Sequence, residues 1–171
     1  MTAELAVFIT MGAAAAVTAS AVVLSKNTVH AVIYLVMNLF SIAVLYLALS
    51  AQMVAFLQII IYAGAIMVLF LFTVMMLNMT GAVEAAEDRL LKQKPLAAAL
   101  GLMLIAEVVM GTVGLFSKPS GSMAIEDGFG SAGEVGSRLF FGYMLPFEVT
   151  SILLLAAIVG SVVLARKKDE E

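Results

Sequence analysis

Long apolar runs separated by short polar segments make up most of this chain. No Asp, Glu, Lys or Arg occurs between Lys26 and Glu84, a stretch too long for one bilayer-spanning helix and about right for two. A tight turn at Ser50-Ala51-Gln52 would separate those two. Applied to the whole chain, the pattern predicts five membrane-spanning helices of about 20 residues or more. They cover residues 4–24, 29–49, 53–78, 95–116 and 139–165.

The composition favours the same fold class. Hydrophobic residues make up 63% of the 171 residues and charged residues 12%, whereas soluble domains average roughly 45–50% and 25%. Five spans absorb nearly all of the apolar residues, so little chain is left for an extramembrane domain. We therefore expect an all-α integral membrane protein that forms a single membrane domain over residues 1–171 and contacts the lipid bilayer.

The charges between the spans predict the orientation. Basic residues concentrate on the cytoplasmic side of membrane proteins, and seven of the nine in this chain fall in connectors on one side. Only Lys118 and Arg138 fall on the other side, so we expect an external N-terminus and a cytoplasmic C-terminus in a bacterial plasma membrane. The seven are Lys26, Arg89, Lys92, Lys94, Arg166, Lys167 and Lys168.

The two longer connectors differ in composition. Residues 80–94 mix both charges and predict a short cytoplasmic connector, whereas residues 117–137 are rich in Gly and Ser and predict a flexible external loop. Within that loop, residues 128–133 match the dinucleotide fingerprint G-x-G-x-x-G. That motif binds pyrophosphate only between a strand and a helix N-terminus, so we do not expect a nucleotide here.

The residue inventory limits the chemistry of the chain. It has no cysteine and one histidine, which excludes disulfides, thiolate-ligated iron–sulfur clusters and bis-histidine haem. A net charge of −3 gives no reason to expect nucleic acid as a partner. We predict no catalytic residue, no metal site and no cofactor in this chain.

Two acidic residues lie inside predicted spans. Glu107 is about 18 Å, and Glu148 about 27 Å, from the cytoplasmic face at 1.5 Å per residue. An acidic group at the centre of a span costs about 2.5–3.5 kcal/mol on insertion scales, so such residues usually have a function. Each is a candidate for a proton path, and the alternative is a hydrogen bond that fastens one helix to another.

Polar residues also form a stripe along the second span. His30, Tyr34, Asn38 and Ser41 fall within about 80° of one another around a helix, so this stripe should avoid lipid and face protein or internal water. We favour hydrogen bonding between helices over proton conduction for this stripe, and keep Tyr34 and Asn38 as proton-path candidates.

The third span combines polar residues with a glycine. Gln58 and Tyr62 are four residues apart, and Gly64 follows them. Glycine allows another backbone to approach closely, and it also relaxes a helix so that a kink or a π-bulge forms. The sequence does not distinguish these outcomes.

The same residues carry a family resemblance. Three segments carry it: Val29-His30-Ala31 through Asn38, Gln58–Phe72 with its Tyr-Ala-Gly-Ala-Ile-Met-Val-Leu-Phe core, and Pro146-Phe147-Glu148-Val149 in the last span. They resemble subunit J of the proton-pumping NADH:quinone oxidoreductase, respiratory complex I. The resemblance implies a membrane-arm subunit without a cofactor. NADH, FMN, iron–sulfur clusters and quinone would belong to partner subunits, and the neighbours would be small and antiporter-like membrane subunits.

The resemblance also implies a mechanism. Family members have a π-bulge in the third helix, and rotation of that helix is thought to open and close a water path that joins quinone reduction to the proton channels. By position, Tyr62, Gly64 and Met67 would lie at the bulge, and Val68 and Phe70 would lie on the moving face. Position 58 is Gln where some members have Glu, so Gln58 would join the proton path without titrating.

Two other functions are compatible with a polytopic chain of this kind. One is a self-contained cation/proton antiporter component that uses Glu107 and Glu148 as carriers, although paired repeats and charge-lined broken helices are not evident. The other is a purely structural assembly subunit.

Overall fold

The structure is a computed structural model that describes residues 2–77, 94–116 and 128–166. Every regular element in these ranges is a helix, in agreement with the expected all-α class. The connector at residues 80–93, the first part of the loop at residues 117–127, and Lys167 and Lys168 lie outside the described residues. The helices are α1 (Thr2–Leu24), α2 (Thr28–Ala48), α3 (Gln52–Leu57), η1 (Gln58–Ile66), α4 (Met67–Leu77), α6 (Lys94–Phe116), α7 (Ala132–Phe141) and α8 (Met144–Ala165).

Four helical segments of the described chain are long and apolar enough to cross a bilayer. They are Ala3–Leu24, Thr28–Ala48, Gln52–Leu77 and Met144–Ala165, and the third consists of α3, η1 and α4 without interruption. The apolar segment found in α6, Ala98–Val113, is shorter than these four. Four of the five predicted spans thus have the expected length and composition, and the span expected at residues 95–116 stays a prediction.

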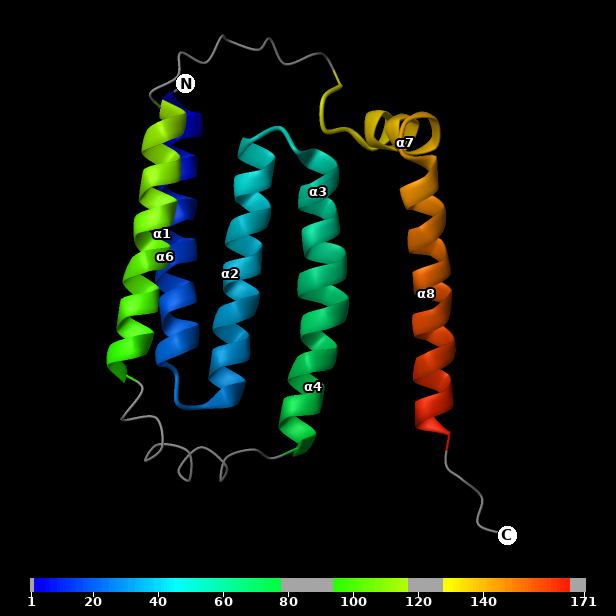
Figure 1. The fold of residues 1–171 in the computed structure, drawn as a ribbon, viewed down its shortest axis with the longest axis horizontal. Coiled ribbons are helices and arrows are strands. Elements are labelled where there is room, and N and C mark those ends of the chain that lie inside the picture. Colours follow the sequence, from blue (N-terminus) through cyan, green and yellow to red (C-terminus); the bar gives the residue numbers. More distant parts are fainter. Residues whose placement is uncertain (1, 78–93, 117–127, 167–171) are drawn as a thin grey trace.

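The spans alternate in direction, as the chain traced in Figure 1 shows. The α1–α2 turn and the C-terminal end of α8 lie at one end of the bundle. The α2–α3 turn and α7 lie at the other end. Lys26, in the first of these turns, and Arg166, which ends α8, are therefore at the same end, as the charge pattern predicts. That this end faces the cytoplasm stays a prediction.

A small core holds α1, α2 and the third span together. Its buried apolar side chains come from α2 and the third span, and most are small, so the helix backbones can approach closely. Two buried polar residues, Asn38 and Ser41, lie in the same core on α2. The buried apolar residues are Val32, Ala43, Ala55, Ala63 and Val74.

α2 begins at a side-chain cap. The Asn27 carboxamide oxygen accepts hydrogen bonds from the backbone N–H groups of Val29 (2.9 Å) and His30 (3.3 Å), which satisfies two otherwise unpaired donors of the first turn. Only three residues separate the end of α1 at Leu24 from the start of α2 at Thr28, and the two helices pack side by side as an antiparallel pair.

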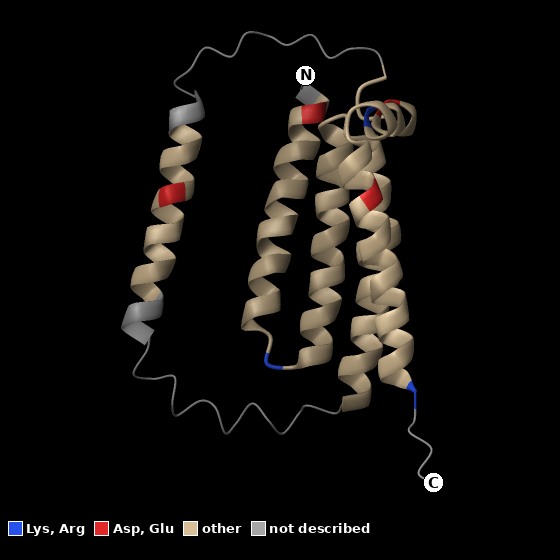
Figure 2. Cartoon of the chain, turned by 45° about the vertical axis from the view of Figure 1, so that its right-hand side comes forward, with Lys and Arg blue, Asp and Glu red and all other residues tan. Residues whose placement is uncertain are grey.

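α6 and α8 stand outside this core. The described side chains of α6, residues 98–113, are exposed apart from Gly101, which is half-buried, and those of α8 are exposed apart from Gly160. α8 contacts α7, and Figure 2 shows α6 separated from the other helices although it overlaps α1 in Figure 1. Both helices thus present apolar surface around their whole circumference.

The last span begins later than predicted. The apolar run was expected to form one helix from residue 139, but residues 132–141 form the separate helix α7, and α8 starts at Met144. Gly142 ends α7, and Figure 1 shows α7 crossing the direction of the spans. The part of the expected flexible loop from residue 132 is therefore helical.

Candidate functional site

The third span contains a π-helix in its middle. η1 covers Gln58–Ile66, and the N–H of Met67 donates to the carbonyl of Tyr62, five residues earlier, as this helix type requires. A Cβ added to Gly64 would lie 3.3 Å from the carbonyl oxygen of Ile59, also five residues earlier. Glycine leaves this crowded position free. The sequence was compatible with a kink, a π-bulge or close packing in this segment. The structure has a π-helix of nine residues there.

The residues expected at the gate differ in their surroundings. Ala63 is buried at 6% exposure, whereas Tyr62 beside it is 50% exposed. Met67 and Gln58 are half-buried, and Gly64 is exposed. Val68 and Phe70 are 62% and 45% exposed. One side of η1 therefore contacts the core, and the side that carries Tyr62 is open.

The structure does not bring the proton-path candidates together. Gln58 lies on η1, Tyr34 and Asn38 on α2, Glu107 on α6 and Glu148 on α8. The two glutamates are exposed on the helices that stand outside the core. A continuous path through these five residues is therefore not formed by this chain alone.

Asn38 makes a hydrogen bond between helices. Its side-chain amide donates to the Ala15 carbonyl (2.7 Å) and to the Thr18 hydroxyl (3.2 Å), both on α1. Asn38 is 9% exposed, whereas Tyr34 on the same stripe is 39% exposed. The polar stripe of α2 therefore faces α1 at Asn38, where it forms hydrogen bonds between the helices, and its Tyr34 side chain is exposed.

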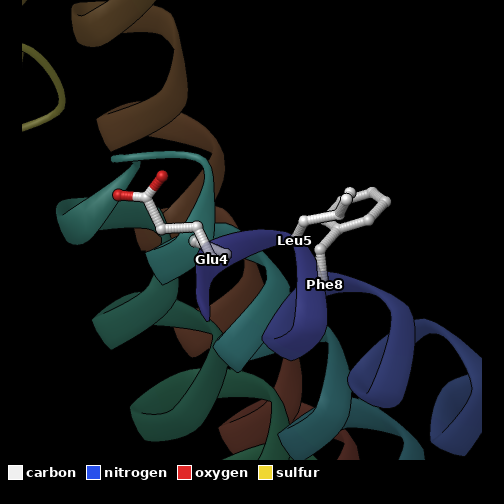
Figure 3. Close-up of a pocket in the computed structure, with 4 residues that line it drawn as sticks. Glu4, Leu5 and Phe8 are labelled. Carbon is white, nitrogen blue, oxygen red and sulfur yellow. The ribbon is translucent and has the colours of Figure 1, made fainter. Parts of the chain in front are cut away.

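A hollow of about 300 Å³ lies at the start of α1. Its lining comes from Glu4, Leu5 and Phe8 of α1 and from Ala48 at the end of α2. In Figure 3 the Leu5 and Phe8 side chains lie together and the Glu4 side chain points away from them. The lining is largely apolar with one carboxylate, and the described residues contain no cluster of three or more His, Cys, Asp or Glu that could hold a metal ion.

The segment that precedes α8 is ordered, contrary to the flexible loop expected there. Ser131 is the N-cap of α7 and its hydroxyl accepts from the N–H of Glu134 (3.4 Å). Glu134 and Arg138, one turn apart, form a salt bridge (2.8 Å). The signal was present in the sequence, because Ser-x-x-Glu is a capping-box pattern that marks a helix start.

A family model for NADH-ubiquinone/plastoquinone oxidoreductase chain 6 matches residues 18–164. The chain belongs to this family. The matched range contains all of α2, η1 and the described α7, and nearly all of α8. It therefore contains every residue expected at the gate or on the proton path.

Curated relatives agree with the family model. The NADH-quinone oxidoreductase subunit J of Pseudomonas aeruginosa is 40% identical over 152 residues, which cover 88% of this chain and 89% of the relative. Subunit J of Escherichia coli K12 is 38% identical over 81% of this chain and 73% of the relative. Subunit J of Rickettsia typhi is 33% identical over 87% and 74%. The similarity extends over most of both chains in each pair.

Proposed function

We propose that this family member is a membrane-arm subunit of a proton-translocating NADH-quinone oxidoreductase, and that its third span is a conformational gate that couples quinone reduction to proton translocation. The family and the names of the relatives support membership in the complex. The observation that carries the gate is the π-helix at Gln58–Ile66 in the middle of a span without charged side chains.

A π-helix is suited to such a gate because its register can change. It accommodates an extra residue relative to an α-helix, and its return to α-helical bonding rotates the following segment by about 100°, the turn of one residue. Such a rotation would exchange apolar Val68 and Phe70 for other side chains in a narrow passage. An apolar constriction excludes water, so the exchange would open or close a water path.

The chemistry of electron transfer would belong to other subunits. This chain has no cysteine and one histidine, so its inventory does not suit an iron–sulfur cluster or a haem. NADH, FMN, the clusters and quinone would bind to partners, and this subunit would contribute the gate and part of the scaffold. The proposed location is a bacterial plasma membrane, with the N-terminus outside.

The outlying helices support assembly with other membrane subunits. Glu107 and Glu148 are exposed on α6 and α8, and lipid tails offer a carboxyl group no hydrogen-bond partner. Neighbouring subunits against α6 and α8 would provide such partners. We propose that the small and antiporter-like membrane subunits pack there, and that the carboxyl groups hydrogen-bond or exchange protons at those contacts.

Copurification tests membership in the complex. The C-terminus is tagged, the membranes are extracted in mild detergent, and the extract is run on a native gel stained for NADH dehydrogenase activity. We expect the tagged chain in a large assembly with NADH dehydrogenase activity. A chain found alone or as a small homo-oligomer contradicts the proposal and favours the antiporter, which ion flux in liposomes would then test.

Two substitutions at one glycine test the gate. Gly64→Ala places a Cβ 3.3 Å from the Ile59 carbonyl, and Gly64→Val adds two further methyl groups. We expect protons translocated per NADH oxidised, measured in inverted vesicles, to fall with Ala and to fall further with Val. The amount of complex on native gels should stay unchanged.

Gly12→Ala on α1 is the matched control, because no atom lies within 4 Å of the added Cβ. It should retain the full ratio of protons to NADH. Assembled Gly64→Val complex with an unchanged ratio would contradict the gate.

A further inference from the structure

The loop before α7 is fastened to the turn between α2 and α3 by its backbone. The N–H of Met53, in the first turn of α3, donates to the Gly130 carbonyl at 2.8 Å. A Cβ on Gly130 would lie 2.2 Å from the Ser50 carbonyl oxygen and 3.0 Å from the Ala51 Cα. Residue 130 therefore touches the turn so closely that no side chain fits.

Both partners hold unusual backbone conformations at this contact. Gly130 has φ +73° and Ser50 has φ 61°, a region that glycine adopts readily and other residues rarely adopt. Gly128 is also left-handed, at φ +95°, but the nearest atom to its Cβ position is 3.9 Å away. Of the two glycines, only Gly130 is required both by conformation and by space.

The same loop is continuous with α7 and α8. Ser131 caps α7, and the N–H groups of Gly142 and Tyr143 both donate to the Arg138 carbonyl at the end of α7 (2.8 and 3.0 Å). The rings of Phe140 on α7 and Phe147 on α8 lie 5.2 Å apart between centroids. A chain of contacts thus joins the start of the third span to the start of α8.

We propose that residues 128–131 form a latch, here called the Gly130 latch, that holds the start of the third span against α7 and α8. The inference rests on the proposed gate and adds positioning residues to it. Only the six residues of α3, about 9 Å of helix, separate the latched turn from η1. When the start of α3 is held, a change in the hydrogen-bond register of η1 rotates α4 and not α3.

The latch also explains the glycine pattern in the loop. Residues 128–133 match a dinucleotide fingerprint in letters, and two of their three glycines, Gly128 and Gly130, adopt left-handed backbone conformations here. Gly133, the third glycine, has no atom within 4 Å of its Cβ position and no left-handed conformation. Alanine substitutions at the three glycines should therefore disturb the backbone to different degrees.

Hydrogen exchange in the intact complex tests the contact first. An amide in the first turn of a helix normally has no backbone acceptor, and no acceptor for Gln52 N–H or Val54 N–H occurs among the described residues. In the unmodified complex we expect the Met53 amide to exchange at least tenfold more slowly than that of Val54 beside it. Equal rates for the two amides overturn the latch without any variant.

Three alanine variants then test its role. Gly130→Ala combines backbone strain with a clash, Gly128→Ala brings strain alone, and Gly133→Ala brings neither. In Gly130→Ala complex we expect Met53 exchange to accelerate at least tenfold and the ratio of protons to NADH to fall. We expect a smaller effect in Gly128→Ala and none in Gly133→Ala. NADH oxidation with ferricyanide and the KM for quinone should stay unchanged, which a general loss of structure would not allow.

The outcomes separate this inference from the proposed gate. If Gly64→Val uncouples the complex and Gly130→Ala accelerates Met53 exchange without uncoupling it, the latch has no positioning role and the gate stands. If Gly130→Ala and Gly133→Ala have the same effect on Met53 exchange, the contact at residue 130 is not the cause. If Gly64→Val leaves coupling intact, the gate fails and the role of the latch in coupling fails with it.

Discussion

The three-helix core and the outlying helices α6 and α8 are equally apolar but differently packed. In the core, α2 buries side chains such as Val32 and Ala43 and donates a hydrogen bond from Asn38 to α1. In α6 and α8 the described side chains are exposed almost throughout. Part of this chain therefore buries side chains against its own helices, whereas α6 and α8 leave nearly all of their described side chains uncovered.

Substitution of a small residue by a larger one should show the largest difference in stability between the core and the outlying helices. Ala43 is fully buried on α2, so Ala43→Leu should destabilise the core by about 1–3 kcal/mol through displaced neighbours. Ala106→Leu on α6, where the side chain is exposed, should have almost no effect on the isolated subunit. Unfolding of the purified subunit in mild detergent measures both. Equal losses would show that α6 packs within the chain after all.

Removal of the α6 carboxyl group should act on assembly. Glu107→Leu should remove a hydrogen bond to a neighbouring subunit, worth about 1–2 kcal/mol in lipid, and so reduce the assembly equilibrium by about 5–30-fold. Glu107→Gln keeps a polar group and should retain most of the complex. Native-gel quantification provides the readout, with the stability of the isolated subunit unchanged. An unaffected Glu107→Leu complex would place this face against lipid.

Loss of the buried amide should weaken the core slightly. Asn38→Leu removes the hydrogen bonds to Ala15 and Thr18, each worth about 0.6 kcal/mol between membrane helices. Thr150→Val on α8 is the control, because the Thr150 hydroxyl bonds only within its own helix, to Pro146. The difference in unfolding free energy between the two variants measures the bond between α1 and α2. No difference would contradict a structural role for Asn38.

The smallest effect is expected at the salt bridge on α7. Glu134→Gln removes the charge attraction to Arg138, whose side chain is 68% exposed, and such ion pairs on a helix contribute about 0.3–0.5 kcal/mol. The loss should disappear at high salt because screening weakens exposed pairs. A loss that persists in 1 M salt would contradict an exposed ion pair as its cause.

Much of the fold was predictable because it depends on local properties. Apolar runs of about 20 residues satisfy their backbone hydrogen bonds within one helix, so the first three spans lie within one residue of their predicted bounds. The start of α8 was not predicted correctly, because the last residues of α7, from Leu139, continue into the apolar run of α8 and the break at Gly142 lies within it. Hydropathy does not detect such a break, whereas the Ser131 cap could have revealed the helix before it.

The site residues chosen from the sequence stay predictions, and their arrangement was not predictable. Gly64 and Tyr62 were identified from the third span, and the structure has a π-helix around them. The side of η1 that faces the core was not predictable, because in an apolar helix almost every position resembles a buried one. The same limit applies to Asn38, whose partner Ala15 carbonyl is a backbone group that any residue would supply.

Composition and the pattern of apolar runs were sufficient for the all-helical class and for four of the five predicted spans, since each helix forms from its own residues. Family membership was also visible in the third span. The contact between Gly130 and Ser50, the bond between Asn38 and α1, and the outlying position of α6 required the folded chain. The first two depend on residues distant in sequence that meet in space, and the position of α6 depends on the lack of such contacts. The strength of such a contact depends on a close fit that no local pattern encodes.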